Sequence, residues 1–62
     1  LSERERQILQ LLADGADTRV IAATLLVAES TVKWHIRNLC AKLQVRTRLQ
    51  ALARARHQGL IQ

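Results

Sequence analysis

Four apolar residues at helical spacing limit the fold of this chain more than any other feature of its sequence. Val32, Ile36, Leu39 and Leu43 are separated by 4, 3 and 4 positions. Because successive side chains turn by about 100° along an α-helix, these four form one stripe on one side of it. The spacing predicts a helix from about Glu29 to Leu43 with that stripe buried.

The rest of the chain is rich in residues that favour helices around the same core. It has 62 residues, 48% of them hydrophobic, with no proline, two glycines and one aromatic residue, Trp34. Few turn formers and few β-branched residues favour an all-α fold and argue against an all-β one. A chain of this length forms one domain with a small core, and no apolar run is long enough to span a membrane. We therefore predict a single domain over residues 1–62, and the missing initial Met suggests that it is excised from a longer protein.

Capping signals predict two helices before this one. Ser2 and Glu5 have the spacing of a capping box, and Gly15 suits the left-handed position that closes a helix. Asp17 or Thr18 is expected to cap a short second helix. The apolar faces are predicted to carry Ile8, Leu9, Leu11 and Leu12 in the first helix, and Ile21, Ala22 and Leu25 in the second.

A fourth helix is predicted after the third. Thr47 with Gln50 has the spacing of a second capping box, and the helix is expected to run to about Gln58. Gly59 would close it, with Leu60 folding back onto its last turn. The sequence therefore predicts an all-α four-helix bundle.

Charge is divided unevenly between the two halves of the chain. Residues 1–29 carry five acids and three bases, a net charge of −2, whereas residues 30–62 carry seven bases and no acid, a net charge of +7. Such an imbalance is relieved by a polyanion. It favours nucleic acid as a partner, with an anionic membrane surface second.

Trp34 is placed unusually for the sole aromatic residue of a small domain. On the helical wheel it lies nearly opposite the apolar stripe, among Ser30, Lys33, Arg37 and Asn38. One interpretation is that Trp34 packs under a neighbouring loop or another domain. The other is that this face docks in the DNA major groove, where basic side chains reach phosphates or guanine and an apolar surface contacts a thymine methyl group. A short helix, a three-residue turn and a third helix with such a face are typical of a helix-turn-helix.

A set of short motifs runs in order along the whole chain. The motifs are Leu1-Ser2-Glu3-Arg4-Glu5, Leu12-Ala13-Asp14-Gly15, Ile21-Ala22, Ser30-Thr31-Val32-Lys33-Trp34-His35-Ile36, Asn38, Lys42-Leu43, Val45-Arg46-Thr47-Arg48, Ala51 and Gly59-Leu60. Each short motif is weak alone, but the ordered set at these spacings is specific. With this set, the chain resembles the C-terminal DNA-binding domain of LuxR-type bacterial transcription regulators over essentially its whole length. The resemblance implies a helix-turn-helix, a third helix that recognises DNA, and dimerisation on two half-sites through the fourth helix.

The resemblance also implies roles for individual residues. At base edges it places Lys33, Trp34 and Arg37. At DNA phosphates it places Arg19, Thr31, Lys42, Arg46 and Arg48. Double-stranded DNA and a second copy of the chain on DNA are the expected partners, RNA polymerase is a further candidate, and neither a membrane nor a cofactor is expected. The implied location is the bacterial cytoplasm, at the nucleoid.

The fourth helix is expected to supply the contacts between copies. Its apolar positions cover a wider arc than one core-facing stripe needs, because Ala51 and Ala55 face one way and Leu49 and Ala53 another. The predicted dimer interface comprises Leu49, Leu52, Ala53 and Arg56. The alternative is that this face covers the first helix.

Three positions depart from what is common in the family. Leu26 in the turn and Gln44 after the third helix stand where the family commonly has Gly, and Ala28 stands where it commonly has a Ser N-cap. A residue other than Gly at positive φ costs about 1–2 kcal/mol, and the lost cap costs about 1 kcal/mol. These departures are expected to lower stability more than they affect function.

Enzymatic functions find little support in the sequence. The carboxylates lie in caps and turns, Cys40 has no suitably placed His, two His and one Cys give no zinc spacing, and no Gly-rich phosphate loop is present. Cys40 is expected to be a small buried apolar residue. Three other interpretations remain open from sequence: a promoter-reading region of a sigma factor, a protein-interaction bundle that uses the Trp34 face, and a basic amphipathic membrane binder.

Overall fold

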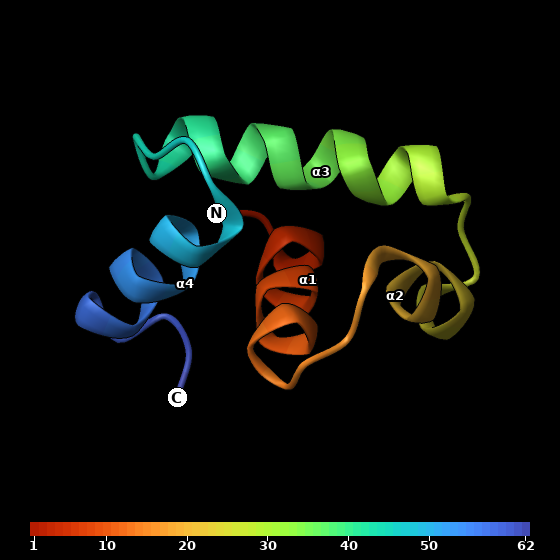
Figure 1. The fold of residues 1–62 in the computed structure, drawn as a ribbon, viewed down its shortest axis with the longest axis horizontal. Coiled ribbons are helices and arrows are strands. Elements are labelled where there is room, and N and C mark those ends of the chain that lie inside the picture. The colour runs from red at the N-terminus through yellow and green to blue at the C-terminus, as the bar shows by residue number, and fades with distance from the viewer.

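The computed structural model describes all of residues 1–62 and contains four helices and no strand. They are α1 (Glu3–Ala13), α2 (Thr18–Leu25), α3 (Glu29–Lys42) and α4 (Arg48–His57). Figure 1 shows α3 lying across the other three, with α2 beneath its N-terminal end, α1 beneath its middle and α4 beneath its C-terminal end. The prediction of an all-α four-helix domain is confirmed, and none of the helices is long and apolar enough to cross a bilayer.

The predicted N-terminal caps of the first two helices are present. Ser2 Oγ accepts a hydrogen bond from the Glu5 backbone N–H at 3.2 Å, and Glu5 Oε1 accepts one from the Ser2 backbone N–H at 2.8 Å. This is the complete capping box predicted for α1. For α2 the cap is Asp17 and not Thr18, because Asp17 accepts from the backbone N–H of Val20 at 2.9 Å.

The cap of α4 differs from the predicted box in one bond. Thr47 Oγ1 accepts from the Gln50 backbone N–H at 3.1 Å, as expected. However, Gln50 Oε1 accepts from the backbone N–H of Arg46 at 2.9 Å, and not from that of Thr47. The reciprocal half of the box has therefore moved one residue outward, which ties the α3–α4 loop to the first turn of α4.

Each of the four helices is followed within two residues by a residue with positive φ. Gly15 and Gly59 have φ of 93° and 74°, which glycine adopts without strain. Leu26 and Gln44 each have φ of 59°, so the two departures from glycine noted in the sequence do carry left-handed backbone. Leu60 folds back as predicted, with its N–H donated to the carbonyl of the third-last helical residue of α4 at 2.8 Å.

The core is built around α1 and the predicted stripe of α3. Every member of that stripe is buried, and α4 contributes two fully buried alanines, Ala51 and Ala55. Two residues expected on apolar faces, Leu11 and Leu25, are only half-buried at the edge of the core. The buried apolar residues are Ile8, Leu9, Leu12, Ile21, Ala22, Val32, Ile36, Leu39, Cys40, Leu43, Ala51, Ala55 and Ile61.

Candidate DNA-binding surface

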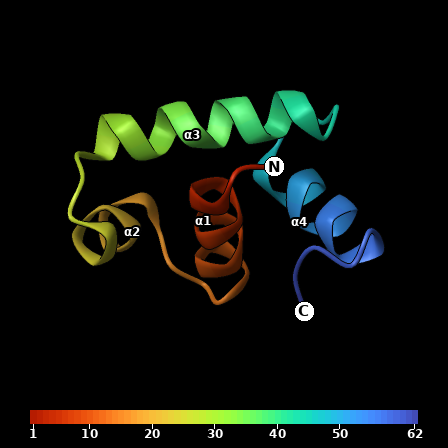
Figure 2. The same ribbon diagram turned by 180° about the vertical axis from the view of Figure 1, so that it is seen from behind.

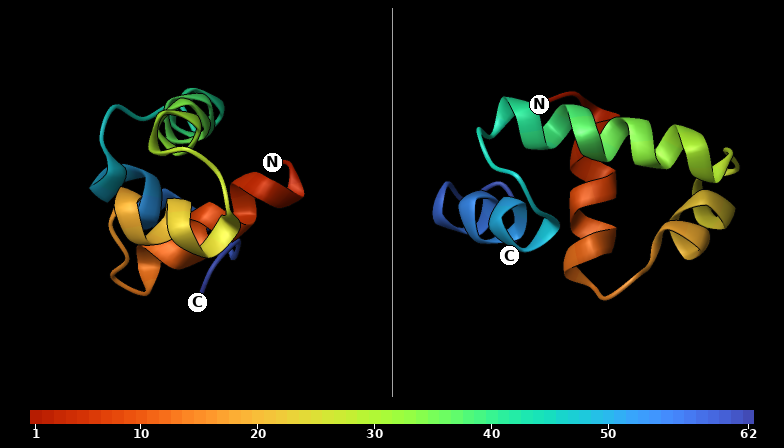
Figure 3. Two further views of the ribbon diagram at one scale, coloured as in Figure 1. Left: turned by 90° about the vertical axis from the view of Figure 1, so that its right-hand side faces the viewer. Right: turned by 45° about the horizontal axis from the view of Figure 1, so that its top comes forward.

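The outer face of α3 is open to solvent along its length. Figures 1 and 2 show the other three helices on one side of α3, and Figure 3 shows the same arrangement with α3 nearly end-on. Because the apolar stripe faces those helices, the residues across the wheel face outward. Ser30, Lys33, Arg37 and Ala41 are exposed, whereas Asn38, which was placed on the same face, is half-buried at its edge.

Trp34 lies on this face with 56% of its surface exposed. Its ring meets the ring of the next residue, His35, edge to face, with centroids 5.1 Å apart and planes at 68°. No loop of these 62 residues covers the indole, so the interpretation that a loop of this domain packs over Trp34 is wrong. An exposed indole beside two exposed cations, Lys33 and Arg37, is the arrangement that docking against a ligand predicts.

The chain has one groove, beside α3. Four cations line it, Lys33 and Arg37 on α3 and Arg46 and Arg48 from the segment that leads into α4. Its remaining lining residues are Ile36, Cys40, Ala41 and Val45. The sequence predicts base-edge contacts for the pair on α3 and phosphate contacts for the other pair. The structure brings all four cations to one concave surface, and no acidic residue lines it.

Cys40 lies in the lining of this groove but is itself buried. Burial raises the pKa of its thiol, although the positive charge of Arg48 acts in the opposite direction. A neutral, buried thiol is a weak nucleophile. The prediction that Cys40 acts as a small apolar core residue is confirmed by its place in the core.

The other phosphate candidates lie on three elements. Arg19 is exposed in the first turn of α2, and Thr31 is half-buried in the first turn of α3. Arg46 and Arg48 are exposed in the segment after α3, which returns alongside that helix and lines the groove with it.

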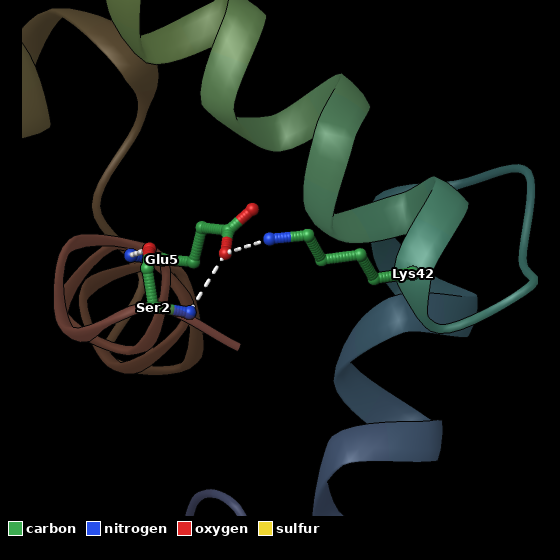
Figure 4. Close-up of polar contacts among 3 residues, drawn as sticks. All are labelled: Ser2, Glu5 and Lys42. Carbon is green, nitrogen blue, oxygen red and sulfur yellow. Dashed lines mark hydrogen bonds and ion pairs between the residues drawn. The ribbon is translucent and has the colours of Figure 1, made fainter.

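Lys42 has a partner that the sequence did not reveal. Its Nζ donates to Glu5 Oε1 at 2.8 Å, and the same carboxylate oxygen accepts from the Ser2 backbone N–H (Figure 4). The Lys42 side chain is 54% exposed, whereas that of Glu5 is 4% exposed. Burial alone would raise the pKa of Glu5, but the hydrogen bonds from Lys42 and Ser2 outweigh it and lower the pKa from 4.5 to about 2.

This ion pair joins the first turn of α1 to the last turn of α3. It satisfies the only buried charged residue of the chain, Glu5, and places a cation where the dipole of α3 favours one. The Lys42 ammonium group already donates to the Glu5 carboxylate. Its contact with a DNA phosphate stays a prediction.

The outer side of α4 bears the predicted contacts between copies. Leu49 is 80% exposed, and Ala53 and Arg56 are exposed beside it, whereas Leu52 is half-buried against the core. The alternative that this face covers α1 is therefore wrong for Leu49 and Ala53. Whether the face meets a second copy stays a prediction.

The family described as "Bacterial regulatory proteins, luxR family" matches residues 1–55. The chain belongs to this family. It is therefore a helix-turn-helix domain of a family of transcription regulators, as the sequence motifs predicted. This membership favours the regulator over the sigma-factor interpretation, and the family is not one of enzymes.

Curated relatives are longer than this chain. It is 51% identical over 51 residues to the nitrate/nitrite response regulator protein NarP of Escherichia coli (strain K12), covering 82% of this chain and 24% of that protein. It is 37% identical over 59 residues to the transcriptional regulatory protein DesR of Bacillus subtilis (strain 168), covering 95% and 30%. The chain thus spans less than a third of the length of either relative.

Two solved structures have the same fold. The response regulator ChrA of a heme-sensing two-component system matches with a TM-score of 0.95 and 46% identity, over 98% of this chain and 30% of that one. The transcription factor GerE matches with a TM-score of 0.96 and 39% identity, over 100% of this chain and 92% of that one. The matched GerE chain is therefore barely longer than this one.

Proposed function

We propose that this domain binds double-stranded DNA with the outer face of α3 in the major groove, as the output domain of a bacterial transcription regulator. The exposed Trp34 beside Lys33 and Arg37 is the observation that carries the proposal. A buried indole would be worth more to a domain with so small a core, so its exposure indicates a binding role. Membership of the luxR family supports the same conclusion.

The cations divide into two groups by position. Lys33 and Arg37 stand with Trp34 at the centre of the outer face, where base edges would lie. Arg46 and Arg48 line the same groove from the segment after α3, and Arg19 and Thr31 lie in the first turns of α2 and α3. Phosphate contacts from these flanking elements would fix the register of α3 on the duplex, whereas the contacts of its outer face would select the sequence.

Salt dependence tests the proposal first. About four phosphate contacts per copy predict that the logarithm of the binding constant falls with the logarithm of salt concentration at a slope of about −3.6. A slope indistinguishable from zero contradicts the proposal. A preference for anionic vesicles over DNA would favour the membrane interpretation, and binding to an acidic protein with no DNA site preference would favour the interaction bundle.

Substitution separates the two groups of cations. We expect Arg37→Ala and Lys33→Ala to cost about 1–3 kcal/mol at the selected site and to relax preference at particular base pairs. Arg48→Ala should weaken binding to all sequences about equally and reduce the salt slope by about 1. Identical behaviour of the two kinds of variant would contradict the division into base and phosphate contacts.

We further propose that two copies occupy two half-sites through the outer side of α4. The exposed Leu49 and Ala53 support this, since they form an apolar strip that the domain leaves uncovered. The strip is too small for a tight dimer in solution, so we expect a free monomer and a dimer on DNA. Leu49→Glu should abolish cooperativity between half-sites and leave binding to one half-site intact, whereas equal loss on both would place the interface elsewhere.

The wider role follows from this site. A DNA-bound regulator of transcription acts on RNA polymerase, which we propose as a further partner. It would act in the bacterial cytoplasm, at the nucleoid, where both polymerase and DNA are found.

A further inference from the structure

A hydrogen bond from Arg54 joins two helices with different proposed roles. Helix α4 is proposed to carry the contact between copies, and α3 is proposed to contact DNA. Arg54 lies on α4, and its guanidinium donates through Nη1 to the backbone carbonyl oxygen of Leu43 at 3.1 Å. Leu43 is the C-cap of α3, so its carbonyl lies beyond the hydrogen bonds of the helix itself. One other side-chain contact joins the two helices, a long one of 4.0 Å from Cys40 Sγ on α3 to the carbonyl oxygen of Thr47, the N-cap of α4.

Small side chains make up the fully buried part of α4. Where α4 meets the rest of the domain, its fully buried side chains are Ala51 and Ala55, and Leu52 is half-buried against the core. Alanine has a single methyl group, which allows close approach but does not interlock in one orientation as a larger side chain does. A directional bond from Arg54 adds a constraint on the orientation of α4 to these apolar contacts.

We propose that Arg54 is a positioning residue that fixes the orientation of α4 relative to α3, and thereby the spacing of DNA half-sites that two copies accept. This inference depends on the proposed dimerisation through α4. Leu49 and Ala53 lie on the same helix as Arg54. A rotation of α4 therefore moves the contact between copies relative to the α3 helix of each copy. One added base pair turns the second half-site by about 35° and moves it by about 3.4 Å, which a fixed α4 cannot follow.

The experiment compares binding to paired half-sites at the preferred spacing and at one base pair more or less. For the unmodified chain we expect strong discrimination between these spacings. Arg54→Ala should reduce that discrimination about threefold to tenfold, with binding to a single half-site unchanged within about twofold. Arg54→Lys, which keeps one charged donor, should restore part of it, and His57→Ala, an exposed neighbour on the last turn of α4, should behave as the unmodified chain.

The outcomes separate this inference from the function on which it depends. Undiminished spacing preference in Arg54→Ala would overturn the inference and leave the proposed dimer intact. Absence of any cooperativity in the unmodified chain would overturn the dimer itself. A melting temperature measured for each variant identifies general unfolding, which would lower binding to single and paired half-sites alike and would count against a positioning role.

Discussion

The two ends of α3 are held in different ways. At its start, Ala28 occupies the N-cap without a side-chain hydrogen bond, and the preceding turn contains Leu26, which is left-handed and 90% exposed. At its end, the last turn is tied to α1 through Lys42 and to α4 through the carbonyl of Leu43. Helix α3 is therefore anchored at its C-terminal end and weakly capped at its N-terminal end.

This difference indicates that substitutions at the N-terminal end of α3 can raise the stability of the domain. The weak end belongs to the turn of the helix-turn-helix, where two unfavourable residues act on one short segment. The anchored C-terminal end connects α3 to α1 and to α4, and α4 is the helix proposed to contact a second copy. Substitutions at the two ends should accordingly have effects of opposite sign.

Breaking the anchor should have the largest effect. Lys42→Met removes the partner of a carboxylate that is almost fully buried, and we expect the free energy of unfolding at pH 7 to fall by about 3 kcal/mol. Urea denaturation measures it. Lys33→Met, which removes an exposed cation from the same helix, is the matched control and should change stability by less than about 0.5 kcal/mol. Equal effects of the two variants would show that the Glu5 ion pair holds nothing in place.

Acid should weaken the same anchor without any substitution. The pKa of Glu5 is lowered to about 2 in the folded chain from a usual value of 4.5, so its contribution to stability is complete above about pH 4.5 and is lost as pH falls through 2. We expect a loss of about 2–3 kcal/mol over that range at constant ionic strength. Glu5→Gln should flatten this part of the stability profile, and an equally steep profile in that variant would assign the loss to other carboxylates.

Repairing the weak end should have a smaller effect of the opposite sign. Ala28→Ser supplies the missing cap, and Leu26→Gly relieves the left-handed strain, so each should raise the free energy of unfolding by about 1 kcal/mol. Gly15→Ala is the matched contrast, since it introduces a side chain at φ of 93° and should cost about 1 kcal/mol or more. A gain from Gly15→Ala, or a loss from Leu26→Gly, would contradict this account of the helix ends.

The features that the sequence predicted well are those that depend on neighbours along the chain. The stripe of α3, the capping box at Ser2 and the strained positions Leu26 and Gln44 follow from spacing and from the conformations that single residues adopt. The partner of Gln50 was placed one residue away, because two adjacent N–H groups lie within reach of one flexible side chain.

The features that were missed depend on residues far apart in the chain. Glu5 and Lys42 are 37 positions apart, and no local pattern distinguishes that pair from the other oppositely charged pairs available. Arg54 and Leu43 are 11 positions apart, and their contact depends on how α4 packs against the end of α3. The groove likewise required the path of the α3–α4 loop, which brings Arg46 and Arg48 beside α3.

The emission of Trp34 tests the central claim most directly. It is the only Trp in the chain, which has no Tyr, so its fluorescence reports on the outer face of α3 alone. In a titration with duplex DNA that contains the selected site, we predict a saturable change in emission that follows binding measured by anisotropy of labelled DNA and is reversed by added salt. DNA binding with no change in the emission of Trp34 would contradict the claim that this face of α3 meets the duplex.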